Sequence, residues 1–149
     1  MSHIGSSGPT NFETYLDSWN DWQDTLKALS FHNGMTIDLA FAVFGPNGNV
    51  DTSKIAALEQ MINAIKTKEQ QTGCQVNIKL SIGGATGLFG PNIKNDQDAQ
   101  NCAIQLAAVV QKYNLAGVDL DIEDPIQGSP NTNPQLVIYF VHHLRAEFD

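Results

Sequence analysis

The stretch GVDLDIE at residues 117–123 decides how the whole chain is interpreted. It is short and largely aliphatic, and glycine and proline bound it, a pattern typical of a buried strand. Side chains two positions apart in a strand share a face. The stretch therefore predicts that Asp119, Asp121 and Glu123 point one way and the aliphatic residues between them the other. Three carboxylates would then line one face of an otherwise buried strand.

The rest of the sequence alternates strand and helix patterns. Apolar periodicity typical of a helix follows each predicted strand, and the helix after the second strand is expected to begin with Asp51 as N-cap and to end before Gly73. Such alternation predicts an α/β domain with a parallel sheet and right-handed crossovers. The four predicted strands occupy residues 12–16, 36–44, 76–82 and 116–122.

Composition excludes several classes of function. The 149 residues carry 8 Lys and Arg against 16 Asp and Glu, and the net charge of −8 repels phosphate backbones and anionic lipid surfaces. No apolar run approaches the ~18 residues that a membrane span needs. We therefore expect no nucleic acid and no membrane as partner, whereas a neutral polysaccharide meets no electrostatic barrier. For Cys74 and Cys102, a place as small core residues and a disulfide both stay open.

The acidic row formed by Asp119, Asp121 and Glu123 is the candidate catalytic centre. Crowded like charges raise the pKa of at least one carboxyl, which keeps a proton donor available near neutral pH. Glu123 sits at the carboxyl end of its strand, where catalytic groups of parallel α/β folds collect. An edge strand with three surface acids and a hard-cation site are the alternatives, but three carboxylates on one strand cannot surround an ion alone. No metal or other cofactor is expected.

Three motifs together carry a family resemblance. Residues 116–123 (AGVDLDIE) resemble the DGxDxDxE signature of glycoside hydrolase family 18, the chitinases and their relatives, in all but the first position. Residues 79–84 (KLSIGG) resemble the SxGG strand of that family, and Ala40 with Phe41 resembles its Ala-Phe pair. The three matches fall in the family's order and spacing and span most of the chain.

The resemblance implies an activity and a role for each acid. The activity would be retaining, substrate-assisted hydrolysis of chitin or related β-1,4-linked N-acetylglucosamine polymers. Glu123 would be the general acid and base that protonates the leaving oxygen. Asp121 would orient the acetamido group as its carbonyl oxygen attacks the anomeric carbon, and Asp119 would share a proton with Asp121, with Ser81 hydrogen-bonding nearby. The outermost acid alone can reach a glycosidic oxygen, which agrees with this division.

The same resemblance suggests residues that contact the sugar. The composition of residues 83–95, which include Gly83 and Gly84, suits a loop that borders the substrate, although a plain connection explains it equally well. Phe41 would stack on a sugar face, although core packing explains it equally well. Tyr15 and Trp19 would line the cleft.

The fold implied is a TIM barrel, which needs about 250 residues, so residues 1–149 are expected to form only the first four βα units, a half-barrel with residues 1–10 as a flexible leader. The missing barrel half or a second copy would cover the open sheet. Ala116 departs from the signature, and Asp124 stands where many members have an aromatic residue. The family's later strands supply a Tyr and a Trp to the cleft, so we expect little turnover from this chain.

Two other hypotheses stay open. A non-catalytic, lectin-like relative would keep the scaffold and bind sugar, although retention of Glu123 argues against it. A complete, doubly wound domain of unrelated function would be a monomer with covered sheet faces. The resemblance favours a secreted or extracellular protein, while the first nine residues have neither the basic start nor the apolar core of a secretory signal.

Overall fold

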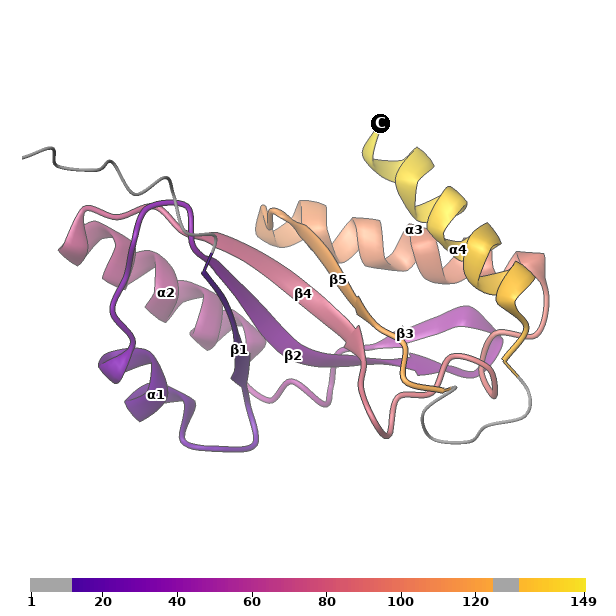
Figure 1. The fold of residues 1–149 in the computed structure, drawn as a ribbon, viewed down its shortest axis with the longest axis horizontal. Helices are drawn as coiled ribbons and strands as arrows, with labels where there is room; N and C mark the ends of the chain where they lie inside the picture. Colours follow the sequence, from indigo (N-terminus) through magenta and orange to yellow (C-terminus); the bar gives the residue numbers. More distant parts are fainter. Residues whose placement is uncertain (1–11, 125–131) are drawn as a thin grey trace, which may run out of the picture.

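Four strands run parallel in a single sheet in the order β1-β2-β4-β5, and the computed structural model describes residues 12–124 and 132–149 (Figure 1). The expected leader at residues 1–10 lies outside the described residues. The four predicted strands are confirmed to within two residues at each end. They are β1 (Glu13–Asp17), β2 (Thr36–Gly45), β4 (Asn77–Gly83) and β5 (Gly117–Asp121).

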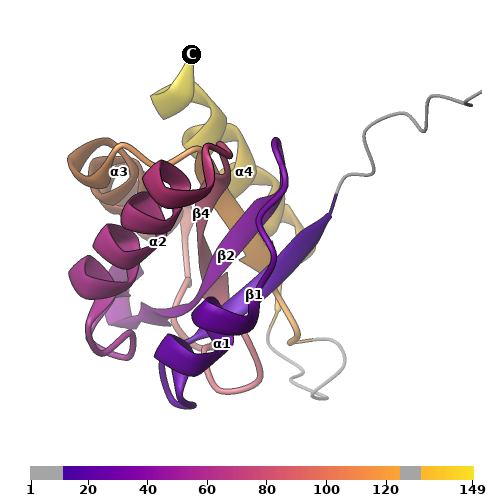
Figure 2. The same cartoon turned by 90° about the vertical axis from the view of Figure 1, so that its left-hand side faces the viewer.

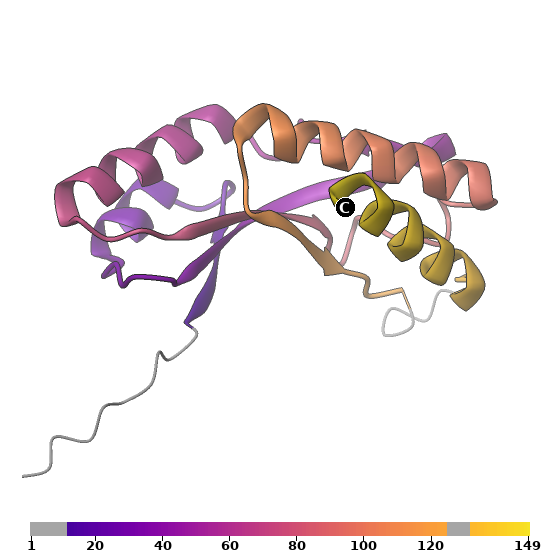
Figure 3. The same ribbon diagram turned by 90° about the horizontal axis from the view of Figure 1, so that it is seen from above.

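One face of the sheet is apolar and lies beneath helices. The helices are α1 (Trp22–Ala28), α2 (Leu58–Thr72), α3 (Asp96–Tyr113) and α4 (Pro134–Phe148). Figure 2 shows α2 and α3 on this face, and Figure 3 shows that they follow one another along the length of the sheet. Helix α4 packs against α3. Ile37, Leu39 and Leu80 point toward the helices and are fully buried, because alternate strand positions share a face. The hydrophobic core therefore sits between the sheet and its helices.

The connection between β2 and α2 differs from the prediction. A 3₁₀ turn, η1 (Pro46–Gly48), leads into β3 (Asn49–Asp51), which pairs antiparallel with the end of β2. The prediction that Asp51 caps the following helix was wrong, because α2 begins at Leu58 after a left-handed Ala57. The Asp51 carboxylate instead accepts a hydrogen bond from the Ser53 N–H at 2.8 Å. Gly73 ends α2 in the left-handed conformation, as predicted.

The long connection from β4 to α3 has two parts. Its first residues lie at the carboxyl end of the sheet, whereas Phe89 is fully buried. The Phe89 ring packs edge-on against Phe44, with centroids 5.2 Å apart, and lies 5.7 Å from the Phe140 ring. This connection is therefore a core element as well as a border of the site.

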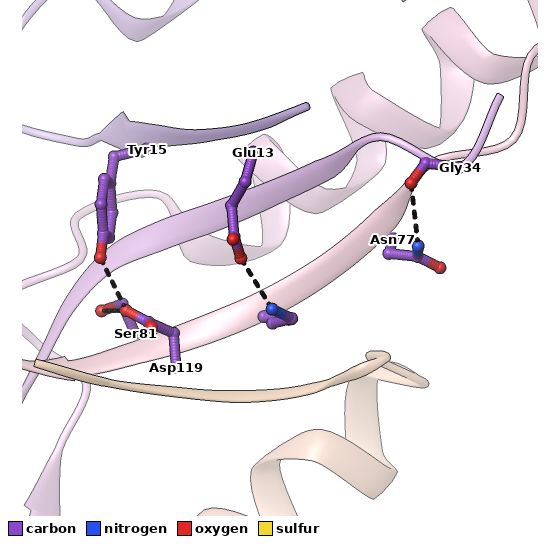
Figure 4. A network of polar contacts seen from close by, with 7 residues as sticks. Glu13, Tyr15, Gly34, Asn77, Ser81 and Asp119 are labelled. Atoms are coloured by element: carbon purple, nitrogen blue, oxygen red, sulfur yellow. Dashed lines mark hydrogen bonds and ion pairs between the residues drawn. The ribbon is translucent and has the colours of Figure 1, made fainter. Parts of the chain in front are cut away.

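The second face of the sheet, here called the open face, is polar. It bears Glu13, Tyr15, Asp38, Lys79, Ser81 and Asp119, which adjacent strands bring into register. Figure 4 shows Glu13, Tyr15, Ser81 and Asp119 on this face of the sheet. Within the described ranges, no helix has the length and apolar character needed to cross a bilayer. Cys74 and Cys102 are both free thiols, and Cys102 is fully buried.

Candidate active site

Asp121 and Glu123 meet just beyond the carboxyl end of β5. The strand ends at Asp121, so Glu123 lies two residues past it and not within it. The charge of the neighbouring Glu123 carboxyl nevertheless acts on Asp121 and raises its pKa. A like charge nearby disfavours ionisation, so the protonated form of Asp121 is favoured.

Asp121 is the acid with the clearer electrostatic perturbation. Partial burial, the negative charges of Glu123 and Asp119, and the hydrogen bond with Glu123 all raise its pKa above the ordinary aspartate value. Burial removes water that would solvate the charge, and like charges disfavour a second ionisation. The expectation that crowding raises the pKa of a carboxyl in this row therefore agrees with the geometry.

Asp119 is held from two neighbouring strands. The Ser81 hydroxyl on β4 donates to Asp119 Oδ2 at 2.6 Å, and the Tyr15 hydroxyl on β1 donates to the same oxygen at 2.9 Å (Figure 4). Ser81 is fully buried. Partial burial of Tyr15 and its hydrogen bond with Asp119 raise the pKa of the Tyr15 phenol above its usual range. Asp119 is thereby fixed in position as the innermost of the three acids.

Gly83 and Gly84 make room for this arrangement. Gly83 has φ +121°, and a Cβ there would lie 2.0 Å from the Asp121 carbonyl oxygen. The Gly84 N–H donates to that oxygen at 2.9 Å, and a Cβ on Gly84 would lie 3.1 Å from the Phe41 ring. A side chain at either position would push β4 away from β5 or from Phe41. The two glycines therefore set the spacing between the acids and the aromatic residues.

Aromatic rings form one wall beside the acids. The Trp19 and Phe41 rings are stacked with centroids 5.7 Å apart and an interplanar angle of 21°, and Tyr15 lies 5.7 Å from Phe41. Trp19 is 61% exposed. Phe41 lies inside β2 after a cis peptide bond, where the register with β4 shifts. The Trp19 and Phe41 rings border a cavity of about 410 Å³ that Val43, Lys54 and residues 83–86 also line.

Asp124 is a site residue that sequence reasoning missed. Its carboxylate is fully buried and accepts hydrogen bonds from the Phe89 N–H at 2.8 Å, the Gly90 N–H at 2.6 Å and the Thr132 hydroxyl at 2.8 Å. The residue directly after Glu123 is thus tied to the connection between β4 and α3. A single Asp gives no sequence signal that its carboxylate will bind distant backbone N–H groups. The position stood out only because many members of the family have an aromatic residue there.

Another tryptophan and two histidines do not contribute to this site. Trp22 is buried in the core. His143 pairs with Asp96 at 2.8 Å between α4 and α3, whereas His142 is exposed. In the part of the chain that the structure describes, no three His, Cys, Asp or Glu side chains are grouped as a metal site would require.

Comparison with known proteins identifies the family. The family model for glycosyl hydrolases family 18 matches residues 11–149. An endo-beta-N-acetylglucosaminidase of Flavobacterium sp. (strain SK1022) is 29% identical over 95% of this chain and 48% of its own length. Endochitinase 4 of Metarhizium robertsii is 30% identical over 74% of this chain and 31% of its own length.

The fold is that of solved chitinases. The crystal structure of a chitinase from Rhizomucor miehei superposes with a TM-score of 0.67 at 21% identity, over 94% of this chain and 44% of that one. The four parallel βα units are accordingly units of a TIM barrel, as predicted. The chain spans about half the length of these relatives or less. On the match of its family model over residues 11–149, the chain belongs to glycoside hydrolase family 18.

Proposed function

We propose that the chain carries the acid side of the active site of a retaining, substrate-assisted glycoside hydrolase. Its substrate would be chitin or a related β-1,4-linked N-acetylglucosamine polymer. The observation that carries this proposal is the Asp119 carboxylate held by Ser81 and Tyr15, on the strand at whose carboxyl end the charge of Glu123 raises the pKa of Asp121. The names of the relatives, an endochitinase and an endo-beta-N-acetylglucosaminidase, favour the same class of substrate.

Glu123 is assigned as general acid and base. It lies outermost of the three acids, two residues beyond the end of β5, where a glycosidic oxygen can approach. The Glu123 carboxyl gives its proton to the leaving oxygen as the bond from the anomeric carbon to that oxygen breaks. The resulting carboxylate then takes a proton from the incoming water, whose oxygen bonds to the anomeric carbon as the bond from that carbon to the acetamido oxygen breaks.

Asp121 and Asp119 are assigned to the acetamido group. The acetamido carbonyl oxygen of the sugar attacks the anomeric carbon from the side opposite the leaving group. Asp121 accepts from the acetamido N–H and stabilises the positive charge that develops there. Asp119 strengthens the hold of Asp121 on a proton, because the negative charge of Asp119 contributes to the raised pKa of Asp121.

The aromatic wall is assigned to sugar binding. The exposed Trp19 ring is stacked on Phe41 beside the 410 Å³ cavity, so it presents a flat apolar surface. Apolar C–H faces of pyranose rings pack well on such surfaces, and the stacked partner holds the ring in place. Gly83 and Gly84 border the same cavity and add no side chains of their own to it.

Hydrolysis of chitotetraose with the wild-type chain and Glu123→Gln tests the assignment. Whatever turnover the wild type has should fall at least about 100-fold in Glu123→Gln, because general acid catalysis contributes that much or more. Unchanged turnover in Glu123→Gln would refute the role of Glu123.

Calorimetry with chitotetraose tests the binding surface. Trp19→Ala should weaken binding by about tenfold, the loss expected for one stacking partner. Tyr139→Ala serves as the control, because Tyr139 is an exposed aromatic on α4. Equal weakening in both variants would contradict the assignment of Trp19. Binding without hydrolysis by the wild type would instead favour the lectin-like alternative.

A further inference from the structure

Asp38 is a buried acid on the open face and has no role in the catalytic steps proposed for Glu123, Asp121 and Asp119. It lies on β2, in register with Tyr15 on β1 and Lys79 on β4. Only 1% of its surface is exposed, and Asp38 Oδ1 has no hydrogen-bond partner among the described residues. A buried carboxylate oxygen without a partner is costly when it carries charge and much less so when the group is neutral.

The surroundings of Asp38 favour its neutral form. Glu13, on the adjacent strand, pairs with Lys79 at 2.7 Å, and this pairing lowers the pKa of Glu13. Glu13 therefore carries a negative charge, and that charge helps to raise the pKa of Asp38. A buried carboxyl with one unpaired oxygen and a negative charge nearby holds its proton more tightly than an exposed aspartate.

Every charged or titratable group that faces Asp38 acts on this proton. Burial has the largest effect, followed by the negative charge of Asp119 on β5 and by the hydrogen bond and charge of Glu13 on β1. Lys79 on β4 opposes them, and the balance raises the pKa of Asp38 to about 7. Tyr15 faces Asp38 from β1 as a neutral phenol that donates to Asp119. Asp38 thus changes charge near neutrality, next to the inner acid of the catalytic row.

We propose that Asp38 is a positioning residue that acts through Asp119 and sets the charge of the acidic row near neutral pH. The proposal rests on the function proposed above. With Asp38 neutral, the Asp119 carboxylate meets little repulsion from β2. Once Asp38 ionises, its charge repels further negative charge on the row and favours the protonated form of Asp121.

A purely structural role for Asp38 makes a different prediction. A buried carboxyl that only links β1 to β4 through Glu13 would affect folding, yet its ionisation would leave Asp119 undisturbed. The two roles therefore differ in whether Asp119 senses the titration of Asp38.

Carboxyl titration by NMR separates these roles. The chain is labelled with ¹³C at the aspartate side-chain carboxyl, and its resonances are followed from pH 3 to pH 9. Asp38→Asn and Asp119→Asn assign two resonances by their loss. We expect the Asp38 resonance to titrate with a midpoint near 7, and the Asp119 resonance to show an inflection at the same midpoint that is absent in Asp38→Asn.

Two further variants keep the test informative where Asp38→Asn fails to fold. Glu13→Gln should lower the Asp38 midpoint by about one pH unit, because it removes a neighbouring charge and frees Lys79 to pair with Asp38. Lys79→Met should move the midpoint upward by a similar amount. Both altered side chains are partly exposed, so the fold should tolerate the changes.

The outcome is read without substrate, so it is independent of the turnover test on Glu123. An Asp38 midpoint below 5 would overturn the proposal. So would an Asp119 resonance that shows no inflection at the Asp38 midpoint, or midpoints that do not move in opposite directions in the Glu13 and Lys79 variants.

Discussion

Replacing Asp124 with alanine should cause a large loss of stability at a position that sequence reasoning treated as a mere departure from the family pattern. The fully buried Asp124 carboxylate is the acceptor for two backbone N–H groups, those of Phe89 and Gly90, and for the Thr132 hydroxyl. The two N–H groups belong to a buried segment whose Phe89 ring packs in the core. Removing the carboxylate leaves both of them without an acceptor.

The expected loss follows from these contacts. An unsatisfied buried donor costs about 1–3 kcal/mol, and the hydroxyl can rotate to another acceptor. Asp124→Ala should therefore lower the free energy of unfolding by about 4 kcal/mol. Asp124→Asn keeps the shape and one acceptor oxygen, so we expect a loss of about 2 kcal/mol. Thr132→Val removes only the hydroxyl donor and should lose about 1 kcal/mol.

Urea unfolding followed by circular dichroism at pH 7 measures all three variants. Asp96→Ala is the matched control, because Asp96 is an exposed aspartate in an ion pair with His143, and exposed pairs contribute at most about 1 kcal/mol. The ranking should be Ala, then Asn, then the Thr132 variant. If Asp124→Ala stayed within 1 kcal/mol of the wild type, the reasoning that Asp124 anchors the connection would be wrong.

Three further predictions follow from the site. Gly83→Ala should lower the free energy of unfolding in urea by at least about 3 kcal/mol, because its Cβ would meet the Asp121 carbonyl oxygen. Gly34→Ala is the control, since Gly34 also has a positive φ but open space around it, and it should lose about 1 kcal/mol. Equal losses in the two variants would contradict the prediction. The folded-state pKa of Asp38 is raised from 3.8 to about 7, so the folded state binds more protons than the unfolded state between these pH values. The stability of the wild type relative to Asp38→Asn should therefore fall by about 4 kcal/mol as pH rises through this range, and a flat difference would disagree. Glu123→Gln should lower the pKa of Asp121 in a carboxyl NMR titration, since it removes a negative charge, and an unchanged value would speak against their contact.

The alternation of apolar strands and helices was readable from the sequence because each element has its own periodicity. The β2 run of aliphatic residues and the helical spacing in α2 and α3 set the fold class, and the structure agrees. The hairpin formed by β3 was not foreseen, because its three residues are too few to show a period. By residue type alone Asp51 could cap a helix or end a short strand. It ends β3, which pairs with β2, and therefore does not cap α2.

The acids of the site were predictable for a similar reason. Asp119 and Asp121 follow the period of a strand, and the SxGG segment marks the neighbouring strand that carries Ser81. Asp38 and Asp124 gave no such signal. Their environments arise from residues far along the chain: Glu13 and Lys79 around Asp38, and the connection after β4 around Asp124. Burial of a single carboxylate cannot be read from local pattern.

The division of the sheet into an apolar face and a polar open face has a consequence for how such a chain can evolve. The aliphatic side that packs under α2 and α3 supplies the driving force for folding. The acidic side adds mutual repulsion, which opposes folding. Replacing the acids of this face with neutral residues can thus keep or raise the stability of the fold while it removes the groups proposed for catalysis. Drift toward an inert descendant is therefore downhill for stability, and selection for the proposed activity would be needed to hold the carboxylates in place.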